Sequence, residues 1–519
     1  MSLEEKIGQV VMCGFNGKEI SLDVRKLIEK YHVGSIILFG RNVESPSQLR
    51  TLTRKLQEIS KIPLLISIDQ EGGIVTRLKG EFTVFPSNMA IAATGNTANA
   101  YLAGLIMATE MRAVGINWDL APVVDVNDLP ENPGIGVRSY SDDPEVVAEY
   151  ATEFVRGLHE GKVAACAKHF PGKGHSAKDA HLEMPVVERS REELENIDFY
   201  PFKSTINMGI DAVMPSHVHY PALCKEEKLP ATLCENVMEN LLREEMNFEG
   251  ICVTDDLEMK GITNSLTGSE AAWRALRAGA DMVMICHTFE EQVKTFEKLK
   301  EKVKDGEVPI ERLDEAVLRV LKLKEKLGLL DGVLEIENSI GSEESRRIAE
   351  NVAQRALTIC RNVNGIIDYI STGPILIVFP LNRKLTMVEE EKEKSVEMEI
   401  VFKRYVNFPV RTIFYSQNPN EDEIKSVLTE IREFDGTIML NTINAYLNEK
   451  LKGFIKEVMN IKSEKTVLVA LRNPYDCFLP GVENSVALYC DSDVSQRVFA
   501  KSIAYNKKLN GKLPLFHLE

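Results

Sequence analysis

The sequence has no apolar run that approaches the roughly 20 residues of a membrane-spanning helix. Positive charge is also scarce, since 62 Lys and Arg against 78 Asp and Glu leave a net charge of −16. Nucleic acids and anionic membranes bind basic surfaces, so we expect neither as a partner. The N-terminal MSLEEKIGQVV lacks the basic and apolar parts of a secretory signal. These absences predict a cytoplasmic protein.

Cysteine pairs of the C-x-x-C type are absent, although the chain has nine cysteines. Cys13, Cys166, Cys252 and Cys286 lie within apolar runs, where a thiol behaves as a small hydrophobic group. We therefore predict no disulfide framework, as suits a reducing compartment.

Nucleotide-binding glycine loops are missing as well, because the chain has neither G-x-G-x-x-G nor a Walker loop. It also has no low-complexity tract and no internal repeat. A length of 519 residues exceeds one ordinary hydrophobic core, so we expect two or three domains.

Eight short apolar runs alternate with amphipathic helical segments in the first part of the chain. Continuously apolar strands that alternate with helices are typical of a parallel sheet covered by helices. Eight such units predict a (β/α)₈ barrel, a TIM-like barrel, over residues 1–330. The predicted strands are residues 9–15, 35–40, 64–69, 117–125, 164–170, 212–218, 251–256 and 282–286, and segments 45–60 and 143–160 are predicted helices.

The second part of the chain repeats the alternation on a smaller scale. A linker is expected at residues 331–342, followed by a domain over residues 343–519 that begins with a long helix at 343–362. Strands at 375–379, 412–415, 437–441, 466–471 and 486–489 alternate with helices such as 420–434. This pattern predicts an open, doubly wound α/β sandwich.

Polar residues gather where the predicted barrel strands end. The βα loops of such barrels meet at this face, which carries the active site. These residues are Asp69, Asp125, Lys168, His169, Ser216, His217, Asp255 and Asp256. Maintenance of the fold does not explain so many of them.

One stretch, KHFPGKGHSAKDAHLEMP at residues 168–185, crowds titratable groups around two glycines. It lacks the spacing of a phosphate loop. His175, Asp179 and His181, with His217 and His219 nearby in sequence, leave a metal-dependent hydrolase open, although no strict ligand spacing is present. A solvated charged loop is the third alternative.

Four further segments supply polar groups to the same face: SIDQEGGIVTRL, NPGIGVRSYSDDP, VMPSHVHYPAL and ICVTDDLEM. Each alone is consistent with a helix cap or a salt bridge. Together they predict a partly acidic pocket with donors and acceptors for several hydroxyl groups. A sugar matches this supply best.

These four segments and the stretch at 168–185, taken in chain order, resemble the five motifs of glycoside hydrolase family 3, in particular its bacterial β-N-acetylglucosaminidase branch. LRNPYD at 471–476 and NGKLP at 510–514 are similar to segments in the second domain of two-domain members. The resemblance implies a retaining exo-β-N-acetylglucosaminidase (a β-N-acetylhexosaminidase) that acts on peptidoglycan fragments or chitooligosaccharides in cell-wall recycling. It implies an oligosaccharide as the partner, no cofactor, no metal, and a monomer or dimer.

The resemblance also assigns roles to residues of this chain. Asp255 would be the catalytic nucleophile, and His181 the general acid/base oriented by Asp179. The sugar would be held by Asp69, Arg138, Lys168, His169 and His217. An imidazole suits the acid/base role because its ordinary pKa of about 6.5 lies near neutrality.

Two activities within the family, and one outside catalysis, stay open. Lys173 and His175 add positive charge near the dyad, which would suit a phosphorylase that transfers the sugar to phosphate. A β-glucosidase is the second alternative, and a catalytically silent sugar-binding protein the third. His175, Lys173 and Ala180 depart from the family pattern, which bears on the loop's conformation, and Cys234 replaces a hydroxyl residue that would cap the next helix.

Overall fold

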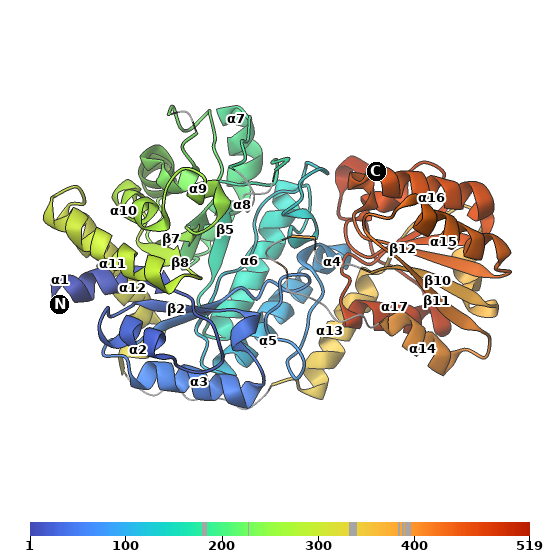
Figure 1. The fold of residues 1–519 in the computed structure, drawn as a ribbon, viewed down its shortest axis with the longest axis horizontal. Coiled ribbons are helices and arrows are strands. Elements are labelled where there is room, and N and C mark those ends of the chain that lie inside the picture. Colours follow the sequence, from blue (N-terminus) through green and yellow to red (C-terminus); the bar gives the residue numbers. More distant parts are fainter. Residues whose placement is uncertain are drawn as a thin grey trace.

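The computed structural model describes residues 1–178, 184–226, 228–331, 340–381, 385–386, 389 and 396–518. Two sheets form the centres of two parts that lie side by side (Figure 1). The first part runs from blue to yellow, and the second from yellow to red. The part from helix α13 (Glu343–Ala356) onward is called the second domain below.

The first sheet contains eight strands in the order β4-β3-β2-β1-β8-β7-β6-β5, and every pair is parallel. Isolated parallel bridges join Trp118 to Ala164 and Val123 to Lys168, so the segment of β4 meets β5 and brings the two edges together. The predicted TIM-like barrel is confirmed. Its strands are β1 Val11–Cys13, β2 Ser35–Leu38, β3 Leu65–Ile68, β4 Trp118–Asp119, β5 Cys166–Phe170, β6 Ala212–Pro215, β7 Ile251–Asp256 and β8 Met282–Ile285.

Helices cover the outside of this barrel. Ser45 and Asp143 cap two of them, each followed by a proline in the first turn, which is why both begin where the sequence predicts. The helices are α1 Leu3–Gln9, α2 Leu22–Glu29, α3 Pro46–Glu58, α4 Asn88–Ala93, α5 Ala98–Ala113, α6 Pro144–Glu160, α7 Arg191–Glu193, α8 Phe199–Asn207, α9 Lys260–Thr263, α10 Gly268–Ala278, α11 Phe289–Lys304 and α12 Ile310–Lys326, with a π-helical segment at Asn236–Glu245.

The barrel interior is a packed hydrophobic cluster with members from all eight strands or the residues beside them. Trp118 and Cys166 are fully buried in it, and α12 contributes Val320 and Leu323. Cys13, Cys166, Cys252 and Cys286 are buried, as the apolar runs predict.

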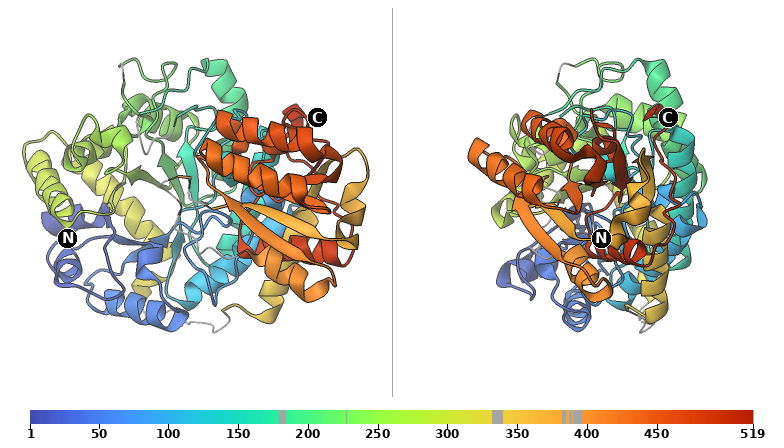
Figure 2. Two further views of the ribbon diagram at one scale, coloured as in Figure 1. Left: turned by 45° about the vertical axis from the view of Figure 1, so that its right-hand side comes forward. Right: turned by 90° about the vertical axis from the view of Figure 1, so that its right-hand side faces the viewer.

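The second sheet has the order β11-β10-β12-β13-β14-β9, with only β9 antiparallel to its neighbour. Helices α15 and α16 pack on one face and α14 and α17 on the other, which confirms the doubly wound sandwich (Figure 2). The strands are β9 Thr358–Asn362, β10 Ile375–Pro380, β11 Val410–Tyr415, β12 Thr437–Thr442, β13 Thr466–Ala470 and β14 Asn484–Ala487. The helices are α13 Glu343–Ala356, α14 Glu397–Tyr405, α15 Glu421–Glu433, α16 Glu449–Lys462 and α17 Asp493–Ala504.

The predicted helix 343–362 is wrong in its last part. Helix α13 ends at Ala356, and β9 takes the next residues. Thr358 and Ile359 are β-branched, and their backbone pairs with β14, which favours the strand over continued helix. Most of the predicted linker, residues 332–339, lies outside the described residues.

The sequence predicts no disulfide framework, and it gives no sign of the one disulfide that the structure contains, between Cys224 and Cys234. An antiparallel bridge between His219 and Pro230 folds this loop back on itself and brings the two cysteines together. The spacing of the two cysteines in the sequence does not indicate that the loop folds back in this way. The other seven cysteines form no disulfide.

The two parts share apolar contacts and hydrogen bonds. Met89, Ala90 and Ala93 of α4, together with Val137, belong to the same buried cluster as the core of the second domain. Ser87 Oγ donates to the carbonyl of Tyr489 at 2.6 Å. Helix α4 therefore lies at the junction (Figure 1).

Within the part of the chain that the structure describes, none of the helices combines the length and the apolar character needed to cross a bilayer.

Candidate active site

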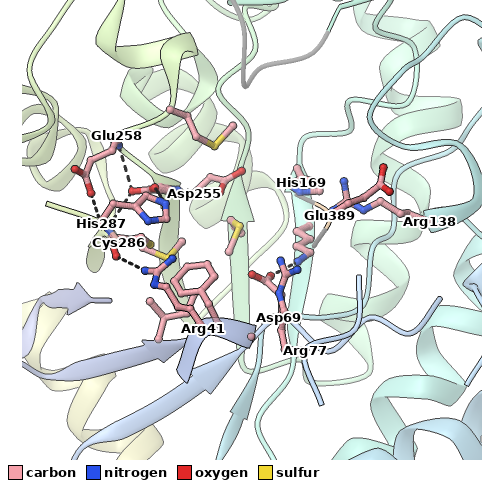
Figure 3. A pocket seen from close by; sticks show the side chains of 18 of the residues that line it. Arg41, Asp69, Arg77, Arg138, His169, Asp255, Glu258, Cys286, His287 and Glu389 are labelled. Atoms are coloured by element: carbon pink, nitrogen blue, oxygen red, sulfur yellow. Dashed lines mark hydrogen bonds and ion pairs between the residues drawn. The ribbon is translucent and has the colours of Figure 1, made fainter. Parts of the chain in front are cut away.

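A cavity of about 650 Å³ opens at the carboxyl ends of the barrel strands, where the sequence predicts the site (Figure 3). This is within the usual size range of small-molecule sites. Five predicted site residues line it: Asp69, Arg138, Lys168, His169 and Asp255. The other polar residues of its lining are Arg41, Arg77, Asp256, Glu258, Lys260, His287 and Glu389.

Lys168 is the centre of a buried group of charges on one wall. Its Nζ lies 2.6 Å from Asp69 Oδ1 and 2.7 Å from Glu71 Oε1. Arg138 donates to both oxygens of Glu71, each at 2.8 Å. The side chains of Lys168, Glu71 and Arg138 are at most 4% exposed.

The charges of this wall shift each other's pKa. Burial alone would raise the pKa of Glu71, but Arg138 and Lys168 outweigh it and lower the pKa to about 2. Burial alone would lower the pKa of Lys168, yet Asp69 and Glu71 raise it above its ordinary value. Lys168 is therefore a cation and Glu71 an anion over the whole physiological range.

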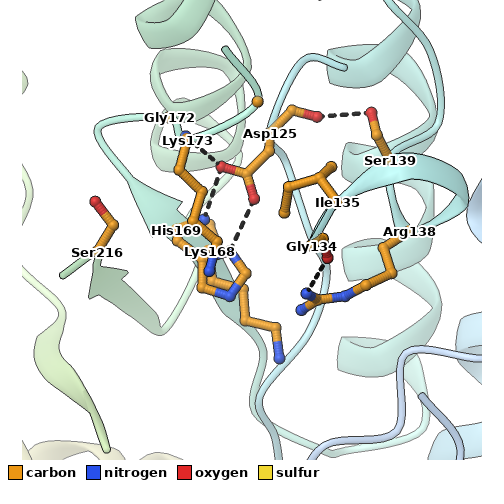
Figure 4. A network of polar contacts seen from close by, with 12 residues as sticks. Asp125, Gly134, Ile135, Arg138, Ser139, Lys168, His169, Gly172, Lys173 and Ser216 are labelled. Atoms are coloured by element: carbon orange, nitrogen blue, oxygen red, sulfur yellow. Dashed lines mark hydrogen bonds and ion pairs between the residues drawn. The ribbon is translucent and has the colours of Figure 1, made fainter. Parts of the chain in front are cut away.

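His169 is oriented by Asp125 (Figure 4). Its Nδ1 lies 2.8 Å from Asp125 Oδ2, while Oδ1 accepts the backbone N–H of Lys173 at 2.7 Å. Burial raises the pKa of Asp125, and the charge of Lys173 opposes that rise. The contact turns the imidazole so that its ring borders the cavity.

Asp255 and Asp256 end β7, and their surroundings differ. Asp256 Oδ1 accepts the backbone N–H groups of Glu258 and Cys286, each at 3.2 Å, and Oδ2 lies 3.2 Å from His287 Nε2. These contacts shape the β7 and β8 loops. Asp255 borders the cavity and accepts the backbone N–H of Asp256 at 2.8 Å.

Comparisons with known proteins place this site in a family. The family model "Glycosyl hydrolase family 3 N terminal domain" matches residues 2–323, which is more than half of the chain. The chain belongs to glycosyl hydrolase family 3. It is a glycoside hydrolase, as the motifs predict.

Individual members of the family are similar to this chain over most of their length. β-Hexosaminidase A of Pseudoalteromonas piscicida is 32% identical over 396 residues, which are 71% of this chain and 66% of that protein. The β-hexosaminidase of Haemophilus influenzae is 37% identical over 295 residues, 56% of this chain and 83% of that protein. The structure of a glycoside hydrolase family 3 β-N-acetylglucosaminidase from Paenibacillus sp. str. FPU-7 matches with a TM-score of 0.94 at 37% identity, over 99% of both chains.

The turn after β3 carries Asp69 and Glu71 of the buried wall, and a hydrogen bond from the end of β4 holds this turn in place. Asp119 Oδ1, at the end of β4, accepts the backbone N–H of Gln70 at 3.0 Å, between Asp69 and Glu71. Gln70 Oε1 in turn accepts the N–H of Arg77 at 2.9 Å. Burial raises the pKa of Asp119 well above its ordinary value. These two hydrogen bonds fix the backbone that carries Asp69, Glu71 and Arg77 in this family 3 protein.

Across the cavity from this wall, Arg41, Glu258 and His287 form an open rim (Figure 3). The exposed Lys260, two residues after Glu258, also lines the cavity and is counted with the rim. The guanidinium of Arg41 lies 4.2 Å from the ring centre of Phe39 and donates to the carbonyl of Cys286 at 2.9 Å. Glu258 accepts the backbone N–H of His287 at 2.6 Å. The side chain of His287 is half-exposed.

The rim and Glu389 are residues that the sequence analysis does not name. Arg77 lies in the segment SIDQEGGIVTRL, and Arg41 comes three residues after β2 ends. Both could have been predicted from the observation that site residues follow the barrel strands. Glu389 lies beyond residue 330 and follows no motif.

His217 does not line the cavity. Its Nδ1 lies 2.8 Å from Thr232 Oγ1, and its Nε2 lies 3.0 Å from the carbonyl of Asp256. Burial lowers the pKa of His217. The ring thus links the loop after β6 to the end of β7, next to Asp255 in the chain.

The predicted dyad, Asp179 and His181, lies outside the described residues. The chain on both sides of it is anchored to Asp128: His175 Nδ1 lies 3.0 Å from Asp128 Oδ1, and Arg189 also pairs with Asp128. Gly172 adopts a φ of 125°, which favours glycine, and a Cβ at Gly174 would overlap the carbonyl of Val126.

No group of three His, Cys, Asp or Glu side chains that could hold a metal ion occurs among the described residues. His219, one candidate ligand, lies with its Nδ1 2.8 Å from the carbonyl of Leu229.

Proposed function

We propose that the protein is a retaining exo-β-N-acetylglucosaminidase, which hydrolyses terminal β-linked N-acetylglucosamine. The observation that carries the proposal is the arrangement of the cavity. The Asp255 carboxylate borders one side, and across from it lie His169 and Asp69 (Figure 3). The relatives named β-hexosaminidase and β-N-acetylglucosaminidase support the same sugar.

Asp255 is the proposed nucleophile. Its carboxylate attacks the anomeric carbon while His181 gives a proton to the glycosidic oxygen, so the aglycone leaves as an alcohol. The product is a glycosyl-aspartate ester. Water then attacks the same carbon as His181 takes its proton, the ester bond breaks, and the configuration is retained. Asp179 orients the imidazole and stabilises its cationic form.

Asp69, Lys168, Arg138 and His169 are proposed to hold the sugar. The mutual ion pairs of the buried wall fix these groups before the substrate arrives, so little ordering is needed on binding. Lys168 and Arg138 act as donors to ring hydroxyls, and Asp69 acts as an acceptor. His217 is proposed to act from behind the site, through Asp256.

Peptidoglycan fragments and chitooligosaccharides are the proposed substrates, which corresponds to a cytoplasmic enzyme of cell-wall recycling. An open rim beside Asp255 leaves space for a variable second sugar. Assays with an N-acetylglucosaminyl-N-acetylmuramic acid disaccharide and with chitobiose separate these two sources.

Water is the proposed acceptor in place of phosphate. The phosphorylase alternative depends on the positive charge of Lys173 and His175 near the site. Neither residue lines the cavity, and His175 is paired with Asp128. Release of sugar 1-phosphate at millimolar phosphate would reverse this choice.

Removal of the nucleophile gives the first test. The wild type should release p-nitrophenol from its β-N-acetylglucosaminide, and Asp255→Ala should reduce kcat by roughly 1,000-fold or more. Asp256→Asn, which alters the neighbouring carboxylate, is the control and should keep a larger share of the activity. Faster cleavage of the β-glucoside than of the acetamido sugar would contradict the proposal and favour a β-glucosidase.

Removal of the acid/base gives the second test. His181→Ala should impair substrates with poor leaving groups far more than activated aryl glycosides, because a phenolate of low pKa leaves without a proton. Rates across a series of aryl leaving groups measure this dependence. Equal losses across the series would show that the proton comes from another group.

A further inference from the structure

The loop after β6, residues 216–234, contacts the chain on both sides of the predicted dyad and also the strand that carries Asp255. A disulfide between Cys224 and Cys234 closes this loop. The Cα atoms of the two cysteines are 6.3 Å apart, within the range that disulfides span. The mechanism proposed above does not use this pair. The contacts of the loop show what the disulfide holds.

Tyr220 contacts the chain before the predicted dyad. Its Oη donates to the carbonyl of Gly172 at 2.7 Å and lies 3.1 Å from Ser216 Oγ. The side chain of Tyr220 is fully buried. A buried hydroxyl that loses its partner costs free energy, so this hydrogen bond restrains the backbone at Gly172.

His219 contacts the chain after the predicted dyad. Its N–H donates to the carbonyl of Pro185 at 2.9 Å, and its carbonyl accepts the N–H of Val187 at 3.0 Å. These two hydrogen bonds form a parallel bridge between the backbones. The loop therefore holds the chain on both sides of the segment that carries Asp179 and His181.

Thr232 contacts the end of β7 through His217. Its Oγ1 lies 2.8 Å from His217 Nδ1, and His217 Nε2 lies 3.0 Å from the carbonyl of Asp256. Asp256 follows Asp255, the proposed nucleophile, in β7. The loop therefore contacts both of the elements that the proposed mechanism must bring together.

The disulfide joins the turn of Tyr220 to the turn of Thr232. The N–H of Cys224 donates to the carbonyl of Tyr220 at 2.8 Å, which places Cys224 in the first turn. The N–H of Cys234 donates to the carbonyl of Ala231 at 3.1 Å, which places Cys234 in the second. The bond between the two cysteines therefore fixes the distance between the two turns, and its loss gives the loop more conformational freedom.

We propose that Cys224 and Cys234 form a redox-modification site that controls the rate of the enzyme. With the disulfide formed, Tyr220 and Thr232 act as positioning residues for the dyad and for Asp255. Thiol–disulfide exchange breaks the link and loosens both contacts, so the oxidised enzyme is the faster form. The inference rests on the proposed function for the roles of Asp255 and the dyad.

A low-molecular-weight thiol is the reductant, and its disulfide is the oxidant. A thiolate of the reductant attacks one sulfur of the pair, so the bond between Cys224 and Cys234 breaks, a mixed disulfide forms and the other cysteine leaves as a thiolate. A second thiolate attacks the reductant's sulfur in the mixed disulfide and releases the second cysteine. Both cysteine thiolates take up a proton, and two electrons have passed from the small thiols, now a disulfide, to the protein. Oxidation is the reverse.

Access to the pair is through the segment between the cysteines. Cys224 and Cys234 are each 3% exposed, whereas Lys225, Glu226 and Lys228 are exposed. Local opening of this segment brings a small thiol to the disulfide without unfolding of the barrel.

Redox treatment of the wild type is the first test, and it needs no variant. Protein treated with glutathione disulfide and protein treated with dithiothreitol are assayed with p-nitrophenyl β-N-acetylglucosaminide. Reduction should lower kcat about fivefold, because small displacements of reacting groups cause losses of this size, and reoxidation should restore it. Alkylation and mass spectrometry should find Cys224 and Cys234 modified only in the reduced protein.

Two cysteine variants locate the effect. Cys224→Ser should have the lower kcat of the reduced enzyme and should respond to neither reagent. Cys360→Ser is the matched control, because it removes a partly buried cysteine of the second domain that forms no disulfide. It should keep the wild-type kcat and the wild-type response. A response that is lost in Cys360→Ser and kept in Cys224→Ser would overturn the inference.

Tyr220→Phe tests the link between the disulfide and the dyad. It removes the hydroxyl that contacts Gly172, so kcat should fall several-fold more for poor leaving groups than for activated aryl glycosides, because only the former need the proton. Reduction should then lower kcat for the poor leaving groups by less than in the wild type, since the disulfide and the hydroxyl act through one contact. An unchanged response of Tyr220→Phe to reduction would refute this route.

Hydrogen exchange separates a failure of this inference from a failure of the proposed function. Reduction should speed amide exchange at Gly172 and Lys173, whether or not the protein hydrolyses the glycoside. Faster exchange in a protein that cleaves no N-acetylglucosaminide would refute the activity and support the coupling. An unchanged kcat in an active enzyme whose two cysteines are reduced, or unchanged exchange in an inactive one, would overturn the inference.

Discussion

The two sides of the cavity are built in different ways. Lys168, Glu71 and Arg138 form a wall whose charges are buried and paired with each other. On the rim, His287 is half-exposed, and Arg41 and Glu258 bond chiefly to backbone atoms. Buried, paired charges are held in fixed positions and favour one ligand geometry, whereas charges in contact with water contribute little energy each. If the proposed function holds, we expect the wall to recognise the terminal sugar and the rim to accept different second sugars.

The largest expected effect distinguishes the wall from the rim by activity. Lys168→Met leaves Asp69 and Glu71 without the cation between them, so kcat/KM for the aryl N-acetylglucosaminide should fall about 1,000-fold. Lys260→Met, on the rim, should cost less than about fivefold. Initial rates of both variants measure the difference. Similar losses in the two variants would contradict the comparison.

The next effect concerns stability. Glu71→Gln breaks a buried ion-pair group and should lower the free energy of unfolding by about 3–5 kcal/mol at pH 7. Glu258→Gln should lower it by less than about 1 kcal/mol. Urea unfolding of both variants tests this, and a Glu71→Gln protein as stable as the wild type would show that the wall is not held by its charges.

The stability difference between the wild type and Glu71→Gln should also depend on pH. The folded state lowers the pKa of Glu71 to about 2, so its contribution to stability is complete above its ordinary pKa and is lost as the pH falls toward 2. The stability difference between the wild type and Glu71→Gln should therefore shrink between about pH 4.5 and pH 2. If the difference in the free energy of unfolding stays constant over this range, it arises from side-chain packing and not from the charge of Glu71.

The smallest effect is expected at Asp119, below the wall. Burial raises the pKa of this carboxyl, so the folded state binds its proton more tightly than the unfolded chain does. That costs stability as the pH rises above the unfolded value of about 3.9. Asp119→Asn keeps the acceptor for Gln70 and does not titrate. It should be about 1 kcal/mol more stable than the wild type at pH 7, with no gain near pH 4, and kcat/KM should change less than about threefold.

Urea unfolding at both pH values measures this effect. A less stable Asp119→Asn protein at pH 7 would show that the carboxyl is ionised and paired in the folded state. Asp119→Ala, which removes the acceptor, is the matched comparison and should raise KM because the turn that carries Asp69 loses its brace.

Much of this arrangement could be predicted from the sequence because it depends on local rules. Continuous apolar runs located all eight barrel strands, and residues at or just after the carboxyl ends of parallel strands must meet at one edge of the sheet. Asp69, Lys168 and Asp255 follow from that rule alone. The family motifs added Arg138, which ends a short 3-10 helix, Gly136–Arg138, and does not lie at a strand end.

Other features depend on contacts between distant segments, which no local pattern records. Glu389 lies at the cavity and is paired with Arg472, which stands 83 residues further along the chain. The end of α13 is set by pairing of β9 with β14, and the Cys224–Cys234 pair by the fold of its loop. The ring of His217 is turned inward by Thr232 and Asp256, which the motif around it does not indicate.

Met89, Ala90, Ala93 and Val137 belong to the barrel chain, yet they complete the apolar core of the second domain. A barrel of this kind that evolved without a partner domain would present those four side chains to water, as a patch prone to association. The loss or gain of the second domain in this family should therefore be accompanied by exchange of these positions between polar and apolar residues. An ancestral series that crosses this event would show whether the surface changed before the domain was acquired or after it.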